Sequence, residues 1–323
     1  MSPQEFIRRH EADWVALERA IVADASTEEA LALPMLYRRA CQQLAIARSR
    51  HYPPALVDRL NLLVVQAHHR LYETRQPMTG LVVRFLLRDF PELVRRHAGL
   101  FWLSALCFYG AFGAIAVAIW WHPSLVYSVM DASQVREFEQ MYDPARRVIG
   151  YSRDDTSDFL MFGYYVQHNI GIGFQTFAGG MIAGVGSLLI LFFNGISIGA
   201  VAGHLTRIGY TETFWSFVCG HGAFELTAIV LSGMAGLMLG RALIAPGNLR
   251  RADALRREAR PAVQIIYGAS LFLLIAAFLE AFWSSSTAIP PPVKYAVALL
   301  LWSGVIAYLL LAGRRMEPPR APR

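Results

Sequence analysis

Long apolar segments constrain this chain more than any other feature of its sequence. The clearest covers residues 98–121 and ends in the aromatic pair Trp120 and Trp121. About 20 apolar residues in an α-helix cross the hydrocarbon core of a bilayer, and amphipathic aromatic rings favour its edges. Hydrophobic residues make up 55% of the chain and charged residues only 17%, as in an integral membrane protein. The sequence therefore predicts an all-α fold built as a polytopic bundle of transmembrane helices.

We expect about six spans in a transmembrane domain over residues 98–313. They lie near 98–121, 159–178, 181–203, 215–240, 262–283 and 293–312. The second is the weakest, because FLMFGYYVQHNIGIGFQTFA contains the polar residues Gln167, His168, Asn169 and Gln175. Such a segment crosses only if it faces protein or water, and an interfacial or re-entrant helix is the alternative. If it crosses, the arginine-rich stretch 241–261 and the basic tail 314–323 are cytoplasmic, as are both termini.

The regions before and between these spans are polar. Apolar residues recur every three or four positions in residues 1–79, which predicts a cytosolic helical bundle. Residues 80–97 interleave Leu and Phe with four basic residues, so we expect an amphipathic elbow helix lying on anionic lipid. These basic residues are Arg84, Arg88, Arg95 and Arg96. Residues 122–158 are acidic on balance and are expected to form an external loop.

Charge and motifs exclude several classes of function. The net charge of +6 is carried almost wholly by arginines outside the apolar blocks, so we read it as a topology signal and expect no nucleic-acid partner. The three cysteines show no CxxC pattern. We find no Walker A sequence, no GxSxG elbow and no GxGxxG after a strand. We therefore expect neither a cofactor nor an enzymatic activity.

An ionisable pair stands inside one expected span. His221 and Glu225 are one helical turn apart in HGAFELTAIVLSGMAGLMLG. Burying such a pair is costly unless it is neutralised, matched to a partner or wetted by a cavity. His204 and Glu280 are expected toward the same membrane face as His221, with Glu225 one turn deeper. Residues at a similar depth in the membrane need not lie close together, so the sequence alone does not predict a cluster.

Three interpretations of the pair remain open. The side chains can hydrogen-bond between helices and fix the bundle. They can line a polar pathway for a proton, an ion or a small solute. They can bind a catalytic metal with a third ligand such as His204, although the spacing is not HExxH. Further intramembrane polar candidates are Asn169, Gln175 and Asn194.

Glycines at small-xxx-small spacing form a second pattern. Gly180 pairs with Gly184, and Gly195 pairs with Gly199. Close helix packing is the ordinary reason for such spacing in membranes. The functional alternative is a broken helix that opens on a site beside Asn194.

Several segments together resemble a known family. They are NGISIGAVAGHL, GHGAFELTAIVLSGMAGLMLG, the LEAF segment at Glu280 and FGYYVQHNIGIGFQTFAGG. The chain resembles the stage II sporulation protein M family of polytopic membrane proteins. Its N-terminus, with RRACQQLAIARSR and RDFPELVRRH, is similar to the longer form found in many bacteria that do not sporulate. The resemblance implies a place in the bacterial plasma (inner) membrane and brings no established enzymatic activity with it.

In spore formers, the family member helps to place cell-wall-degrading partners at the septum. We therefore expect a membrane scaffold that recruits or positions protein partners of the cell envelope, lies in the lipid bilayer and can form a homo-oligomer. The first alternative is a transporter or channel-like subunit with a polar pathway through His221 and Glu225. The second alternative is an intramembrane metal-dependent hydrolase.

Overall fold

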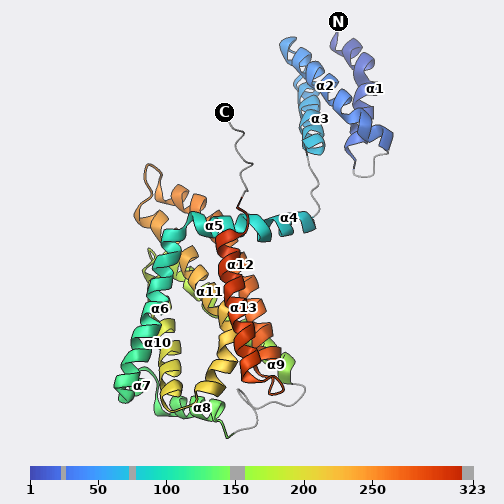
Figure 1. Ribbon diagram of the computed structural model, residues 1–323. Coiled ribbons are helices and arrows are strands. Elements are labelled where there is room, and N and C mark those ends of the chain that lie inside the picture. Colours follow the sequence, from blue (N-terminus) through green and yellow to red (C-terminus); the bar gives the residue numbers. More distant parts are fainter. Residues whose placement is uncertain (23–26, 73–77, 146–156, 315–323) are drawn as a thin grey trace, which may run out of the picture. The chain divides into compact units, whose positions relative to one another are not determined.

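The computed structural model describes residues 1–22, 27–72, 78–145 and 157–314, and these residues form helices without a strand (Figure 1). This confirms the all-α fold. The chain divides into two compact units, the N-terminal unit Met1–Leu81 and the membrane unit Val82–Arg323. Residues 146–156 of the expected acidic loop and residues 315–323 of the basic tail lie outside the described residues.

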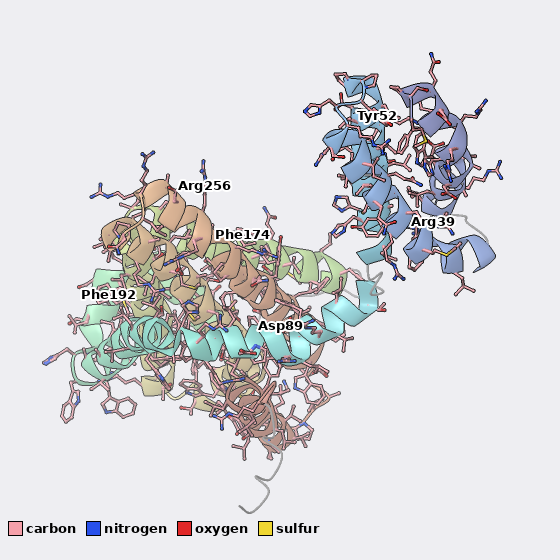
Figure 2. All side chains as sticks on the ribbon, turned by 90° about the horizontal axis from the view of Figure 1, so that it is seen from above. Arg39, Tyr52, Asp89, Phe174, Phe192 and Arg256 are labelled. Atoms are coloured by element: carbon pink, nitrogen blue, oxygen red, sulfur yellow. The ribbon has the colours of Figure 1, made fainter. Side chains whose placement is uncertain are left out.

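The N-terminal unit consists of three helices around its own core. They are α1 (Pro3–Ile21), α2 (Thr27–Ser49) and α3 (Pro54–Tyr72). Ser2 begins α1 as its N-cap, because its hydroxyl accepts a hydrogen bond from the backbone N–H of Glu5 at 3.2 Å. Trp14 is buried in the core and donates its indole N–H to Gln43 Oε1 at 2.6 Å. Tyr52, which Figure 2 labels in this unit, belongs to the same core, and its ring packs edge-on against that of Phe6 with centroids 5.2 Å apart.

A bent helical segment leads into the membrane unit. It comprises α4 (Met78–Arg84), the π-helical turn η1 (Phe85–Asp89) and α5 (Phe90–Arg96). Pro91 lies at the start of α5, where its missing N–H interrupts the helical ladder and a wider turn precedes it. The segment is fixed by Arg95, which donates to the carbonyl of Leu309 at 2.8 Å. Residues 80–96 are therefore helical, as expected for the elbow. That this segment lies at the bilayer surface stays a prediction.

Five described helices in the membrane unit are long and apolar enough to cross a bilayer. They are α6 (Ala98–Trp121), α10 (Val185–Arg207), α11 (Thr211–Ile244), α12 (Arg251–Phe278) with its π-helical extension η4 (Leu279–Ser284), and α13 (Pro291–Leu311). In α11, 83% of the most apolar window is buried, against 22% in α6 and in α13. The long α11 is therefore the central helix, and α6 and α13 are peripheral.

The expected second span coincides with α9 (Ser157–Ala178), which is not among these five. Tyr165, near its start, packs with Ala281, and Gly173 near its end lies against Leu273. Because α12 and η4 run in the opposite direction beside it, α9 extends along the bundle. Its crossing of a bilayer stays a prediction.

Glycines set the pairing of α6 with α10. A β-carbon at Gly195 would overlap the carbonyl oxygen of Phe108, and one at Gly203 would lie 2.8 Å from that of Ala116. Later residues of α10 thus contact later residues of α6, so the two helices run parallel. The chain between two parallel helices must return along the bundle, and α9 follows that path.

The remaining predicted glycines lie where the chain enters α10. Gly180 belongs to the short 3-10 turn η3 (Gly179–Met181) and abuts the backbone of Gly236 in α11. Gly184 caps α10 with a φ of +80°, a left-handed conformation that glycine adopts without steric cost. This turn makes α10 begin later than the expected residue 181.

Short helices cover one end of the membrane unit. After α6 come η2 (Pro123–Leu125), α7 (Val126–Val129) and α8 (Ala132–Tyr142). Asp131 begins α8 as its N-cap and accepts hydrogen bonds from the backbone N–H groups of Ser133 and Gln134 at 2.8 and 2.9 Å. The Ser133 hydroxyl also bonds this carboxylate, and together these bonds hold the pKa of Asp131 below its ordinary value.

Candidate functional site

The pair His221 and Glu225 lies on the central helix α11, and its side chains point to the same side. His221 Nε2 lies 3.7 Å from Glu225 Oε2, which is longer than a hydrogen bond. Only 4% of the His221 surface is exposed. The edge of Phe217, one turn earlier in α11, packs on the imidazole with ring centroids 5.4 Å apart. The imidazole therefore has little freedom to rotate.

The π-helical turn η4 places two further polar side chains against this pair. His221 Nδ1 lies 3.0 Å from the hydroxyl of Ser284, at the end of η4. One ligand atom each from His221, Glu225 and Glu280 lies within 4.8 Å of the other two. π-Helical turns shift the side chains that follow them and are frequent at functional sites. We expected His204, His221 and Glu280 near one membrane face. Of these, His221 and Glu280 meet in one cluster with Glu225.

A lysine supports the cluster from α13. Lys294, the only lysine in the chain, is 3% exposed and donates to the carbonyl of Ser284 at 2.7 Å. Sequence reasoning singled out neither Ser284 nor Lys294. Lys294 could have been found, because it is a lone lysine at the start of an apolar span. Nothing in the sequence distinguished Ser284 from its neighbours Ser285 and Ser286.

The cluster opens on a cavity of about 400 Å³. His221, Glu225 and Glu280 line one side of it, and the rest of the wall comes from other residues of α11 and from α7, α8 and α10. The other lining residues are Val129, Met130, Gln134, Phe138, Tyr142, Ser197, Ile198, Val201, Phe214, Phe217, Val218, Gly222 and Leu226. The wall is mostly apolar, with a few converging polar groups, which is the usual character of a small-molecule or ion site.

His204 does not belong to this cluster, and this corrects the expected set of metal ligands. Its Nε2 lies 2.8 Å from Glu139 Oε1, which α8 supplies. His204 lies near the end of α10, where α8 covers the bundle, so its side chain meets α8 instead of α11. Glu280 takes the place that the sequence analysis gave to His204 as the third candidate ligand.

The other polar candidates lie apart from the cluster. The Asn194 side chain donates back to the carbonyl of Ile190, one turn earlier in α10, at 2.8 Å. Asn169 is buried in α9, and its amide nitrogen has no hydrogen-bond partner among the described residues. Gln175 is exposed on the same helix. The structure therefore gives no sign that α10 opens on a site beside Asn194.

The four arginines of the elbow pair mostly with acidic residues of the same segment. Arg84 lies 3.5 Å from Asp89, and Arg96 lies 3.5 Å from Glu92. Arg88 lies 4.0 Å from the other oxygen of Glu92. These groups are largely exposed, so the pairs contribute little to stability and the guanidinium groups can also contact other anions.

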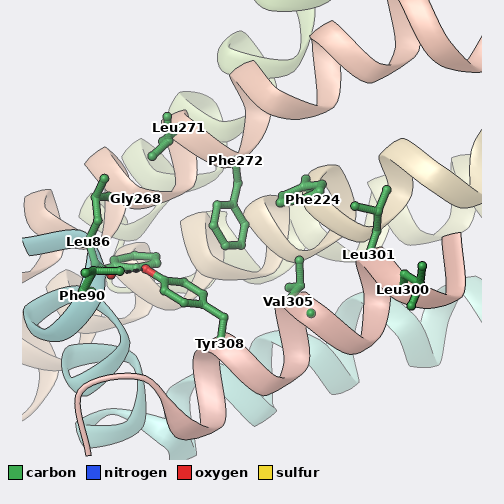
Figure 3. A pocket seen from close by; sticks show the side chains of 12 residues that line it. Leu86, Phe90, Phe224, Gly268, Leu271, Phe272, Leu300, Leu301, Val305 and Tyr308 are labelled. Carbon is green, nitrogen blue, oxygen red and sulfur yellow. Dashed lines mark hydrogen bonds between the residues drawn. The ribbon is translucent and has the colours of Figure 1, made fainter. Parts of the chain in front are cut away.

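A second cavity lies between the elbow, α11, α12 and α13 (Figure 3). Its volume is about 360 Å³, and its walls are aliphatic and aromatic, with Phe90, Phe272 and Tyr308 at one end. The Tyr308 hydroxyl is already engaged, because it donates to the carbonyl of Leu86 at 2.5 Å. This cavity offers no converging polar groups, so we place the candidate site at the cluster on α11.

A bundle of long apolar helices around a buried polar cluster defines a helical membrane protein. The family model for Stage II sporulation protein M matches residues 99–285, which is more than half of the chain and includes the whole cluster. The chain belongs to the stage II sporulation protein M family. A second model, Domain of unknown function (DUF8413), matches residues 4–73 in the N-terminal unit. No curated protein and no solved structure matches the chain.

Proposed function

We propose that this protein is a non-catalytic scaffold of the bacterial inner membrane that recruits or positions partners of the cell envelope. The observation that carries the proposal is the N-terminal unit, a three-helix bundle with its own core that matches a family of its own. Because the buried core of this bundle is made of its own residues, the bundle can act as a separate docking module. The membrane unit then acts as the anchor.

We further propose that the anchor has six spans and cytoplasmic termini. Figure 1 shows α5, the end of α11, the start of α12 and the end of α13 at one end of the membrane unit, and the sequence concentrates arginines in these segments. Contacts join these segments, since Arg241 of α11 lies 3.3 Å from Glu258 of α12. The opposite end carries α8 with Asp131, Glu137 and Glu139. The enrichment of arginine in cytoplasmic segments supports this orientation.

In-cell photocrosslinking tests the scaffold role. A photoreactive phenylalanine analogue replaces Leu62 or Val65, which are exposed one turn apart on α3. We expect both positions to yield an adduct with the same envelope protein, and an adduct of twice the chain mass would identify a homo-oligomer. The control position is Leu106 of α6, which is 72% exposed on an apolar helix and is expected to react with lipid. Absence of a protein adduct at both α3 positions would contradict the scaffold role.

The cavity beside His221 favours a second candidate function, a polar pathway for an ion or small solute. Ionisable residues inside a membrane domain usually face water or a substrate. Flux of protons and metal ions into proteoliposomes tests it, with the Glu225→Gln variant as the comparison. Flux that the variant abolishes would support a pathway, and equal leak in the wild type and the variant would contradict it.

A further inference from the structure

We propose that His221, Glu225 and Glu280 bind one divalent transition-metal ion in the cavity between α8, α10, α11 and η4. This inference does not depend on the scaffold role. It assigns a ligand set to the described cluster and replaces the set with His204 that the sequence suggested. Zn²⁺ is the ion used to test the site.

The spacing of the side chains fits one shared ion. Zinc binds histidine nitrogen and carboxylate oxygen at about 2.0 to 2.2 Å, which in a tetrahedral site separates neighbouring ligand atoms by about 3.4 Å. His221 Nε2 and Glu225 Oε2 lie 3.7 Å apart, and the set of three lies within 4.8 Å. Small rotations of the two glutamate side chains would therefore bring all three ligand atoms to these distances. The cavity of about 400 Å³ leaves room for a water molecule as the fourth ligand.

The surroundings of His221 hold the ring as metal-binding histidines are usually held. When Nε2 binds a metal, Nδ1 carries the proton, and here it faces the Ser284 hydroxyl at 3.0 Å. The backbone of Ser284 is fixed in turn by Lys294, 2.7 Å from its carbonyl oxygen. A hydrogen bond that the second ring nitrogen donates sets the tautomer and the ring orientation. This arrangement is an observation separate from the clustering of the three ligands.

Charge gives a third argument. Two carboxylates that converge among apolar helices are costly to bury as anions. A divalent cation between the carboxylates would balance both charges. One imidazole with two carboxylates suits Zn²⁺, Mn²⁺ or Fe²⁺ better than the all-oxygen sites of Mg²⁺ and Ca²⁺.

Metal content and titration of the purified full-length protein test the proposal. The purification tag is removed, the protein is stripped with a chelator, and Zn²⁺ is titrated by calorimetry. We expect one Zn²⁺ per chain, with an affinity at least 100-fold weaker in Glu225→Gln and Glu280→Gln. Ser284→Ala removes only the orienting hydroxyl and is expected to weaken binding about 10- to 100-fold.

The pair His204 and Glu139 supplies the matched control. It is also a buried histidine beside a glutamate in the same unit, but it lies outside the cluster. Glu139→Gln should therefore bind Zn²⁺ like the wild type. X-ray absorption should show one nitrogen ligand and oxygen ligands at about 2.0 to 2.2 Å.

Three results would overturn the metal site. The first is a monodisperse wild-type protein that takes up no Zn²⁺, Mn²⁺ or Fe²⁺. The second is equal uptake by wild type and Glu280→Gln. The third is equal weakening in Glu139→Gln, which would place the bound metal elsewhere. Gel filtration of each variant shows that it is folded before the comparison is made.

Discussion

The helices of the two units pack in different ways. The N-terminal unit encloses large side chains such as Phe6, Trp14 and Leu17, and ion pairs such as Arg59 with Glu11 lie on its surface. The membrane unit brings backbones together at glycines and leaves Trp102 and Leu106 exposed. Phe174 and Phe192 are also exposed on its surface (Figure 2). The hydrophobic effect drives the first kind of packing, whereas close van der Waals contact drives the second, because lipid is as apolar as the helices.

The comparison extends to the polar residues. In the N-terminal unit, Arg59 bridges Glu11 and Glu18 at the surface, where water already solvates all three groups. In the membrane unit, the polar cluster lies at a cavity between helices. A soluble bundle can place charge almost anywhere on its surface, but a membrane bundle must give each charge a partner or a wet space. For this reason the cluster on α11 says more about function than the surface ion pairs of Arg59 do.

The largest expected effect is the loss of the α6–α10 contact in Gly195→Leu. A β-carbon at Gly195 overlaps the backbone of Phe108, whereas one at Gly113 of α6 meets nothing within 4 Å. We expect Gly195→Leu to abolish monodisperse protein in detergent and Gly113→Leu to behave as the wild type, as measured by size-exclusion chromatography. Equal behaviour of both variants would show that backbone contact does not hold this unit together.

The second prediction concerns the core of the N-terminal unit. Trp14 is 1% exposed, so Trp14→Ala should cost about 3 to 5 kcal/mol through lost burial and an unfilled cavity. Leu62→Ala, at an exposed position on α3, is the control and should change stability little. Limited proteolysis should then cleave the N-terminal unit of Trp14→Ala quickly and leave the membrane unit intact. Simultaneous loss of both units would show that they fold as one.

The third prediction concerns surface charge on the same unit. The guanidinium of Arg59 lies 5.5 Å from the Trp14 ring centroid and pairs with Glu11 and Glu18 at 3.0 and 3.2 Å. The hydrogen bonds that Arg59 donates to Glu11, opposed by burial, raise the pKa of Arg59 above its ordinary value, so it stays charged at every accessible pH. Since these groups are partly exposed, Arg59→Ala should cost only about 1 kcal/mol in a denaturant titration. A cost as large as that of Trp14→Ala would contradict the surface assignment.

The smallest expected effect is at the start of α8. The hydroxyl of Ser133 and the backbone bonds lower the pKa of the Asp131 carboxyl, so its stabilising effect is present above the unfolded pKa near 3.8 and is lost as pH falls through the lower folded value. We expect Asp131→Ala to speed hydrogen exchange at the first amides of α8 near neutral pH. Asp131→Ser keeps a capping oxygen and should exchange like the wild type. Equal exchange in all three proteins would show that this cap does not hold α8.

Local patterns in the sequence were enough to find most elements. The recurrence of apolar residues every three or four positions over residues 1–79 predicted helices that the structure contains, and Leu56, Leu60 and Leu63 of α3 are buried at this spacing. Apolar length predicted five of the spans, because crossing a bilayer depends on residues that are adjacent in sequence. The π-helical turns at Phe85–Asp89 and Leu279–Ser284 escaped prediction, since they have no comparable pattern.

The sequence by itself determined that this chain is an all-helical membrane protein with an ionisable pair in one of its apolar spans. Hydrophobicity and helical periodicity are local properties, so the residues alone carry them. Only the tertiary structure decided that Glu280 and Ser284 meet His221 while His204 meets Glu139. Which side chains meet depends on the rotation and register of packed helices, and these follow from glycine contacts and a π-helical turn far from the pair in sequence.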